Sequence, residues 1–175
     1  MKYKMIIPGL ALLFFIGCSE PSSYVLEVTT FRTKTTTNTF VFNKLDGEVE
    51  ANFTSQQPGF IERQSAVNEQ GEYIVLVYWN SMDEADASMN KFMKDESVAE
   101  YASMIDGASM KMSRFQTSEM FDKKNSSFIE VMSFETKEGT EPKAFKKLNK
   151  KVGNEVTAPK EGFVQRIMGM NETGR

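Results

Sequence analysis

The alternation of apolar and polar residues near the start of the chain predicts a strand followed by a helix. Val25 to Thr33 alternates with period two and is rich in β-branched side chains, which is typical of a strand. Four apolar residues then recur at steps of three and four, as one face of a helix requires: Phe42, Leu45, Val49 and Phe53. This helix is expected to begin near Asn38 and to end before Pro58-Gly59, because proline and glycine interrupt helices.

The next segment predicts a hairpin of two strands. Phe60 to Val67 alternates again, and Asn68 to Gly71 is a polar turn. Tyr73 to Trp79 is almost continuously apolar, as expected of a strand that is buried on both faces. Strands joined by so short a turn are antiparallel neighbours, so we expect Tyr73 to Trp79 near the centre of a sheet.

A second helical region and a fourth strand complete this unit. Ser81, with Glu84 three residues later, forms a capping box that opens a helix through about Lys94. Val98 to Ile105 continues as a short helical piece, and Ala108 to Gln116 is the fourth strand. The order βαββαβ, with the helices on one face, predicts a ferredoxin-like α+β unit.

The opening half of this unit recurs 103 residues later in the chain. Identical pairs, more numerous than background usage gives, include Glu27/Glu130, Val28/Val131, Phe31/Phe134, Phe42/Phe145, Gly59/Gly162 and Arg63/Arg166. The copy predicts a strand from Ser127, a helix over Ala144 to Val156 and a strand through Met170. We therefore divide the chain into a domain over 24–116, a linker over 117–126 and a partial second repeat over 127–175. Because its strand edges are unpaired, the repeat is expected either to dock on the first sheet or to form a homodimer.

The first 23 residues predict export and a lipid anchor. Lys2 and Lys4 precede an apolar run too short to span a bilayer stably, which is the organisation of a signal peptide over 1–17. Phe15-Ile16-Gly17-Cys18 resembles a bacterial lipobox, in which the signal is cut before a cysteine that is then acylated. With Ser19 next and a tether over 18–23, this predicts attachment of Cys18 to the membrane, in the cell envelope and at the outer membrane. The alternative is an ordinary signal peptide with an incidental cysteine.

Composition excludes several kinds of chemistry. The chain has no histidine, which removes Ser-His-Asp and Cys-His catalysis, imidazole zinc sites and a proximal-His haem. Cys18 is the only cysteine, so the exported part has no disulfide and no Cys-ligated metal. The 21 Lys and Arg less Lys2 and Lys4 leave 19 against 24 acidic residues, a net charge of −5. This acidic balance argues against nucleic acid as a partner, and we expect no metal site.

Two stretches of the first unit resemble a known family. Gln57-Pro58-Gly59-Phe60, followed by Gly71 to Trp79, then Asn80-Ser81 and a helix, is similar to the antibiotic biosynthesis monooxygenase (ABM) superfamily. Its members are dimeric α+β barrels with a PGF turn and a strand ending in Trp-x-Ser. The likeness covers Tyr24 to Gln116 in full and Ser127 to Gly174 in part. The expected fold class is thus α+β, a ferredoxin-like βαββαβ unit of the dimeric α+β barrel type followed by a second, incomplete βαβ repeat.

The resemblance implies oxidative chemistry of two kinds. ABM members oxidise quinol-like or polyketide aromatics without metal or flavin, or they bind haem and cleave it. The haem-cleaving branch uses an Asn on the first strand and a His on the second helix, whereas this chain has Val28 at the first position and no His near Ser103. The resemblance therefore implies a monooxygenase that needs no cofactor and acts on a small aromatic or quinol-type ligand, rather than a haem-degrading enzyme.

Six residues are candidates for such a site: Arg63, Trp79 and Glu27 as catalytic residues, and Tyr73, Tyr78 and Tyr101 as substrate-binding residues. Trp79 stands where the family lines its pocket. Arg63 lies within an apolar strand face and would bind a phenolate, with Glu27 as base or orienting partner. Because both recur, as Glu130 and Arg166, the structural alternative is that Glu and Arg satisfy each other across the sheet. The tyrosines would hydrogen-bond a substrate oxygen or pack in the core.

Two functions are therefore kept open. An enclosed cavity containing Arg63 and Trp79 would favour a lipid-anchored oxygenase. A filled core around these residues would favour a non-catalytic envelope protein that uses the fold to bind a small apolar ligand or for assembly.

Overall fold

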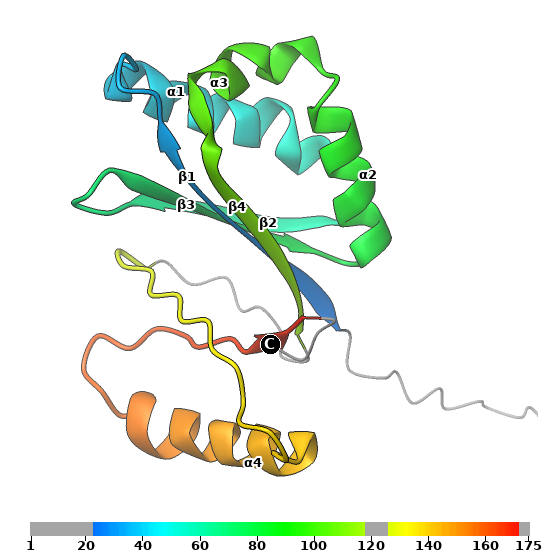
Figure 1. Ribbon diagram of the computed structural model, residues 1–175, viewed down its shortest axis with the longest axis vertical. Coiled ribbons are helices and arrows are strands. Elements are labelled where there is room, and N and C mark those ends of the chain that lie inside the picture. Colours follow the sequence, from blue (N-terminus) through cyan, green and yellow to red (C-terminus); the bar gives the residue numbers. More distant parts are fainter. Residues whose placement is uncertain (1–22, 118–125, 172–175) are drawn as a thin grey trace, which may run out of the picture.

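The computed structural model describes residues 23–117 and 126–171 and has an α+β architecture (Figure 1). The first unit contains β1 (Tyr24–Thr33), α1 (Thr39–Asn52), β2 (Phe60–Val67), β3 (Glu72–Trp79), α2 (Met82–Phe92), α3 (Ala99–Met104) and β4 (Ile105–Thr117), with 3-10 turns at Thr54–Gln56 and Glu96–Val98. The expected signal peptide, Cys18, nearly all of the tether and most of the linker lie outside the described residues. Within the described ranges, no helix has both the length and the apolar character that crossing a bilayer requires.

The strands form one antiparallel sheet in the order β2-β3-β1-β4-β5. Its last strand, β5 (Gly169–Met170), comes from the C-terminal part of the chain. β3 lies between β2 and β1, and β1 lies between β3 and β4, so β1 and β3 are central. The ferredoxin-like βαββαβ unit is thus confirmed, and the continuous apolar run of β3 follows from its burial on both faces.

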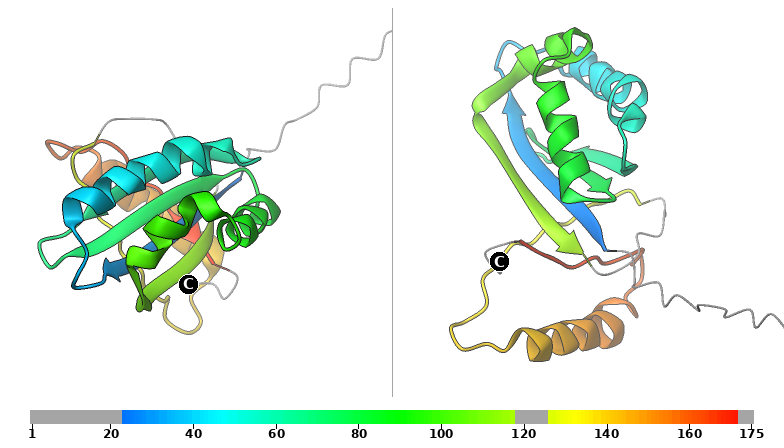
Figure 2. Two further views of the ribbon diagram at one scale, coloured as in Figure 1. Left: turned by 90° about the horizontal axis from the view of Figure 1, so that it is seen from above. Right: turned by 90° about the vertical axis from the view of Figure 1, so that its right-hand side faces the viewer.

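The helices α1, α2 and α3 cover one face of this sheet, and the core lies between them and the strands (Figures 1 and 2). Its buried members include Val25, Phe31, Phe42, Val49, Tyr73, Val75, Val77, Trp79, Val98 and Tyr101. Phe42 of α1 packs with ring centroids 4.8 Å from both Tyr73 of β3 and Tyr101 of α3. These aromatic contacts hold α1 and α3 on the sheet.

Local sequence signals explain where the elements of the first unit begin. The Asn38 side chain accepts hydrogen bonds from two backbone N–H groups in the first turn of α1, and the Ser81 side chain caps α2 by accepting from the N–H of Glu84. The turn before β2 places Gly59 at φ 77°, in the left-handed region that favours glycine. A Cβ at this position would overlap the Glu84 side chain. Both the backbone conformation and the available space therefore require glycine at 59.

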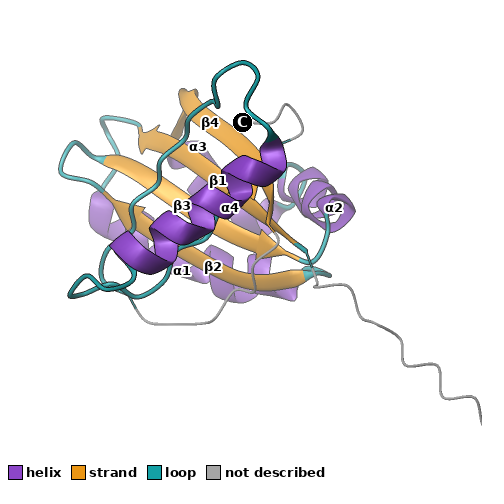
Figure 3. Ribbon diagram, turned by 90° about the horizontal axis from the view of Figure 1, so that it is seen from below, coloured by secondary structure: helices purple, strands orange, loops and turns teal. Residues whose placement is uncertain are grey.

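The C-terminal part lies on the opposite face of the sheet from α1, α2 and α3 (Figures 1 and 3). It contains α4 (Pro142–Val152), which continues into a π-helical turn (Gly153–Thr157), and β5, which pairs with the end of β4. None of the residues described from 126 to 171 is buried. Phe128, Met132 and Leu148 are 83%, 71% and 59% exposed. This part has no core of its own and lies against the first sheet within the same chain.

Two strands expected in the C-terminal part do not form as predicted. The helix is present, but residues 127–136 belong to no strand, and only Gly169–Met170 forms the second. The reason is visible in the first unit, where β1 and β2 do not touch because both are hydrogen-bonded to β3. No counterpart of β3 occurs among these 175 residues. The two segments therefore run extended without a strand between them.

Candidate functional site

Arg63 lies on the helix-facing side of β2 and is held by a carboxylate of α1. Its Nη2 donates to Asp46 Oδ1 at 2.5 Å and its Nη1 donates to Asp46 Oδ2 at 3.2 Å. The hydroxyls of Ser65 and Tyr101 also donate to this carboxylate, at 2.7 and 2.8 Å. Both charged side chains are nearly inaccessible to solvent. Asp46 thus organises a buried polar cluster that joins α1, β2 and α3.

Glu27 finds its partner on the other side of β1. In the sheet, Val77 of β3 separates Glu27 from Arg63, whereas Arg114 of β4 is its direct neighbour. The Nε of Arg114 donates to Glu27 Oε2 at 2.6 Å, and its Nη1 contacts Asp86 of α2. The expectation that Glu27 and Arg63 satisfy each other across the sheet is therefore wrong, because each is neutralised by a different residue.

Burial and ion pairing act in opposite directions on these two carboxyls. Burial alone would raise the pKa of Asp46, but the hydrogen bonds and charge of Arg63, with the two hydroxyls, lower the pKa below its usual value. Burial raises the pKa of Glu27, and the charge of Arg114 compensates only in part. Asp46 is therefore a carboxylate bound to Arg63, which leaves this guanidinium poorly suited to hold a substrate anion.

Trp79 ends β3 inside the packed core. It is 2% exposed, and Phe60 lies edge-on to it with ring centroids 6.1 Å apart. Its Nε1–H is buried and has no hydrogen-bond partner among the described residues. Trp79 and Arg63 are thus both buried among the helices and strands of the first unit.

The three candidate tyrosines do not converge on one site. The hydroxyl of Tyr73 donates to an asparagine of α1 at 3.0 Å, and that of Tyr101 donates to Asp46. Tyr78 faces the opposite side of the sheet, where burial raises its pKa to about 12. Only Tyr101 therefore shares a cluster with Arg63.

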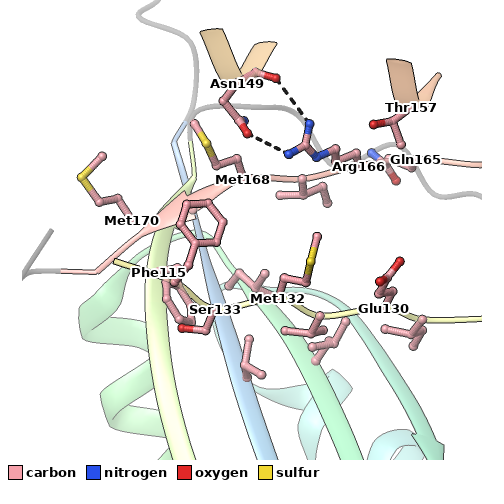
Figure 4. Close-up of a pocket in the computed structure, with 18 of the residues that line it drawn as sticks. Phe115, Glu130, Met132, Ser133, Asn149, Thr157, Gln165, Arg166, Met168 and Met170 are labelled. Atoms are coloured by element: carbon pink, nitrogen blue, oxygen red, sulfur yellow. Dashed lines mark hydrogen bonds between the residues drawn. The ribbon is translucent and has the colours of Figure 1, made fainter. Parts of the chain in front are cut away.

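A cavity of about 1180 Å³ lies on this opposite side, between the sheet and the C-terminal part (Figure 4). Its floor is formed by outward-facing side chains of the first sheet, among them Leu26, Val28, Leu76, Tyr78, Ser113 and Phe115. Its other walls come from residues 126–136, from α4 and from residues 162–170. Of the six site residues predicted from the sequence, Tyr78 alone lines it.

Arg166 and Glu130 project from opposite walls of this cavity (Figure 4). Arg166 Nη2 donates to the side-chain oxygen of Asn149 at 2.7 Å, and Nη1 donates to the backbone oxygen of Asn149 at 3.3 Å. These positions correspond to Arg63 and Asp46, so a neutral amide stands where the first unit has a carboxylate. In the part of the chain that the structure describes, neither Glu130 nor Arg166 forms an ion pair. Three charged side chains among the described residues line the cavity, those of Lys111, Glu130 and Arg166, and none of them forms an ion pair with another.

Two extended segments border the cavity, residues 128–134 and 164–168, and neither belongs to a strand. We call the space between these two segments the strand slot. At the aligned place of the first unit, β3 lies between β1 and β2. A further strand could therefore pair along the edges of the strand slot.

Sequence reasoning missed Asp46, Arg114 and Asn149. Asp46 lies four residues after Phe42 and three before Val49, on the apolar face of the predicted helix, and a charged residue on such a face signals a buried partner. Arg114 could not be found without the pairing of β4 with β1. Among the described residues, no group of three or more His, Cys, Asp or Glu side chains is arranged to hold a metal ion.

Comparisons with known proteins find similar solved structures. No protein-family model matches the sequence, and no curated protein matches it. A solved structure of SnoaB, a cofactor-independent oxygenase from Streptomyces nogalater, is similar, with 14% identity, a TM-score of 0.46 and coverage of 57% of this chain and 98% of that one. A Caulobacter crescentus protein provisionally assigned as an antibiotic biosynthesis monooxygenase matches with 18% identity, a TM-score of 0.45 and coverage of 54% and 90%.

A third similar structure is a dimeric ferredoxin-like protein of unknown function from Thermobifida fusca, with 12% identity, a TM-score of 0.44 and coverage of 54% and 91%. The structural neighbours of this chain are therefore ABM-like, ferredoxin-fold proteins. At these identities and TM-scores, they carry no argument about activity. The fold itself rests on the strand order and register given above.

Proposed function

We propose that this protein is a lipid-anchored component of the bacterial cell envelope whose ABM-like domain serves assembly, by receiving an extended apolar segment of a partner polypeptide in the strand slot. The strand slot is the observation that carries this proposal. A β-strand would satisfy the backbone groups of both edges and would direct its side chains alternately toward the first sheet and toward α4.

The lining of the cavity, which measures about 1180 Å³, supports a strand over a small molecule. Its lining includes large apolar side chains such as Phe115, Phe128, Met132 and Met168. A small apolar ligand would cover part of this surface but would form no ladder of backbone hydrogen bonds with either edge. An apolar strand matches both features.

The lipid anchor in this proposal rests on Phe15-Ile16-Gly17-Cys18. An acyl chain on Cys18 would hold the domain at the membrane surface, where other envelope polypeptides are concentrated. Growth of expressing cells with a radiolabelled or alkyne-bearing fatty acid tests this part. Label should enter the wild-type chain and not Cys18→Ser, and equal labelling of both chains would disprove the anchor.

Amide hydrogen exchange of the full chain tests the assembly function. In an empty slot, the amides of residues 128–134 and 164–168 should exchange at nearly the rate of an unfolded peptide. In an assembled protein, prepared from the envelope fraction in mild detergent, both segments should be protected together. Fast exchange of both segments in every preparation would disprove the proposal. Thermal stabilisation by small apolar compounds without amide protection would also count against assembly and would indicate ligand binding.

A cofactor-independent monooxygenase acting on a quinol-type substrate is the second candidate, and one observation favours it. The buried Nε1–H of Trp79 has no partner among the described residues and is available to donate to a substrate oxygen. Oxygen consumption by the full chain with quinols and anthrone-like phenols, compared with Trp79→Phe, tests this function. Uptake above autoxidation that falls in a folded Trp79→Phe variant would support it, and no uptake across the panel would exclude it for these substrates.

A further inference from the structure

The helix α4 carries a dense group of positive charges and no negative one. Five of its eleven residues are lysines, namely Lys143, Lys146, Lys147, Lys150 and Lys151. The 19 Lys and Arg that follow the expected signal peptide, less these five, leave 14 against 24 acidic residues in the rest of the chain. Glu141 and Glu155 lie just beyond the two ends of α4, where Glu141 caps the helix and Glu155 contacts Lys151 at 3.8 Å. A basic surface therefore stands on an otherwise acidic protein.

The lysines and the cavity use different sides of α4. With 3.6 residues per turn, the five lysines fall within an arc of about 140°, and we call the surface that they form the lysine face. The side toward the sheet carries Phe145, Asn149 and Val152, which line the cavity, whereas none of the five lysines lines it. All five lysines are exposed, and α4 lies in front of the sheet when the molecule is seen from below (Figure 3). A partner that contacts the lysine face therefore leaves the cavity open.

We propose that the lysine face lies on a bilayer of anionic phospholipid. The ammonium groups of the lysines attract the phosphates of such a surface, and each basic residue near it strengthens binding about five-fold. At the edge of the lysine face, Leu148 lies one turn from Lys151 and is 59% exposed, so its side chain can reach the boundary of the acyl chains. A lysine-rich helix with an exposed apolar edge is typical of helices that lie in the plane of a membrane surface.

The entry of the chain into the first sheet places α4 on the side of the expected lipid anchor. Tyr24 pairs with Thr117, and Thr117 pairs with Gly169, so β1 begins beside the C-terminal part. This end of β1 and α4 both lie away from α1, α2 and α3 (Figures 1 and 2). The six residues from Cys18 to Tyr24 can span at most about 20 Å. An acylated Cys18 would thus hold the lysine face close to the bilayer.

The lysine face and an acyl chain would act together. One acyl chain gives only marginal membrane binding, and a basic surface is a second signal that makes attachment stable. This inference rests on the lipid anchor of the proposed function and adds a second contact with the membrane. It does not involve the strand slot.

Chemical modification of lysines in the full chain tests this contact. The chain is purified from expressing cells in mild detergent and reconstituted into vesicles of phosphatidylcholine, or of equal parts phosphatidylcholine and phosphatidylglycerol. A water-soluble acetylating reagent is added, and mass spectrometry gives the rate at each lysine. In the mixed vesicles the lysine face should react more slowly than in phosphatidylcholine alone, and high salt should remove the difference by screening. The exposed Lys44 and Lys94 are internal controls that should react equally in both.

Two double variants measure how much the charges contribute. Lys147→Gln with Lys150→Gln should lower the equilibrium constant for protection of Lys143 and Lys151 by roughly 25-fold, about five-fold for each lysine removed. Lys44→Gln with Lys94→Gln removes two exposed charges from the side of α1 and α2 and should leave that constant unchanged. All four substitutions alter exposed side chains, so both variants should keep native Trp79 fluorescence.

Three results would overturn the inference. They are equal reaction of the lysine face in both kinds of vesicle, equal loss of protection in the two double variants, and protection that needs added envelope proteins but not phosphatidylglycerol. The last result would indicate an acidic polypeptide as the partner. Fatty-acid labelling of Cys18 separates this inference from the anchor. A labelled chain with an unprotected lysine face keeps the anchor alone, an unlabelled chain with a protected lysine face keeps the lipid contact alone, and a chain with neither property disproves both.

Discussion

Asp46 on α1 and Arg63 on β2 form a buried ion pair, with guanidinium nitrogens 2.5 and 3.2 Å from the two carboxylate oxygens. The same two positions in the C-terminal part carry Asn149 and Arg166, joined by a neutral hydrogen bond of 2.7 Å. The charge of Arg63 is therefore neutralised inside the core, whereas the charge of Arg166 remains available at the cavity.

Removal of the Asp46 charge should destabilise the first unit strongly. Asp46→Asn leaves the buried Arg63 guanidinium with only the partly exposed Glu50, whose Oε2 lies 3.5 Å from Nη1, and breaking a buried pair typically costs about 3 kcal/mol or more. Urea unfolding followed by Trp79 fluorescence at pH 7 measures the loss. Glu48→Gln, which removes an exposed partner of Lys44, is the matched control and should change stability by less than about 0.5 kcal/mol. Equal losses of stability from the two substitutions would show that burial does not strengthen the contribution of the Asp46–Arg63 pair.

The contribution of Asp46 should also depend on pH. Its pKa in the folded protein is lowered from the ordinary value of 3.8, so its stabilisation is fully present above pH 3.8 and is lost as pH falls through the folded pKa. The stability difference between wild type and Asp46→Asn should therefore be constant from about pH 5 to 7 and should shrink below pH 4. The raised pKa of Glu27 gives the stability a pH dependence of the opposite sign. Because Glu27 is present in both proteins, this contribution cancels in the stability difference. A difference that grows on acidification would contradict the assignment.

The hydroxyl of Tyr101 should contribute more to the free energy of unfolding than the hydroxyl of Tyr73. Tyr101 donates to the charged Asp46 at 2.8 Å, whereas Tyr73 donates to a neutral amide at 3.0 Å. Hydrogen bonds to charged groups contribute about 1.5–3 kcal/mol and neutral ones about 1 kcal/mol. Tyr101→Phe should therefore lose about 2 kcal/mol and raise the pKa of Asp46 in a carboxyl NMR titration. If Tyr73→Phe costs as much, or if the Asp46 titration does not move, the hydrogen bond to Asp46 is not the cause.

Alanine substitutions at two glycines of the first unit distinguish the cost of backbone strain from the cost of steric conflict. Gly59 and Gly71 both have positive φ, but only at 59 would a Cβ collide with a neighbour, the Glu84 side chain. Gly71→Ala should cost about 1–2 kcal/mol, the penalty of a left-handed conformation. Gly59→Ala should cost more, because Glu84 must also move away from Ser81, to which it is hydrogen-bonded at 2.8 Å. Urea midpoints compare the two, and equal losses would show that Glu84 moves freely.

The elements of the first unit could be predicted because their signals are local. The start of α1 near Asn38, the cap at Ser81, the break at Gly59 and the apolar run of β3 depend on residues close in the chain, and each is found where the sequence placed it. The partners of Arg63 and Glu27 could not be predicted, because they depend on which strands and helices become neighbours. The prediction of a strand from Ser127 was wrong because a strand forms only where another strand pairs with it, and the local sequence does not show which strands become neighbours.

The absence of buried side chains between residues 126 and 171 has a consequence for abundance. If a partner polypeptide supplies a strand to the strand slot, ordering of the C-terminal part is a bimolecular process, and the ordered fraction rises with the concentration of that partner. At a low partner concentration this part would remain open to proteases, whereas at a high concentration it would be protected. Turnover of the protein would then follow the supply of its partner without any additional regulator.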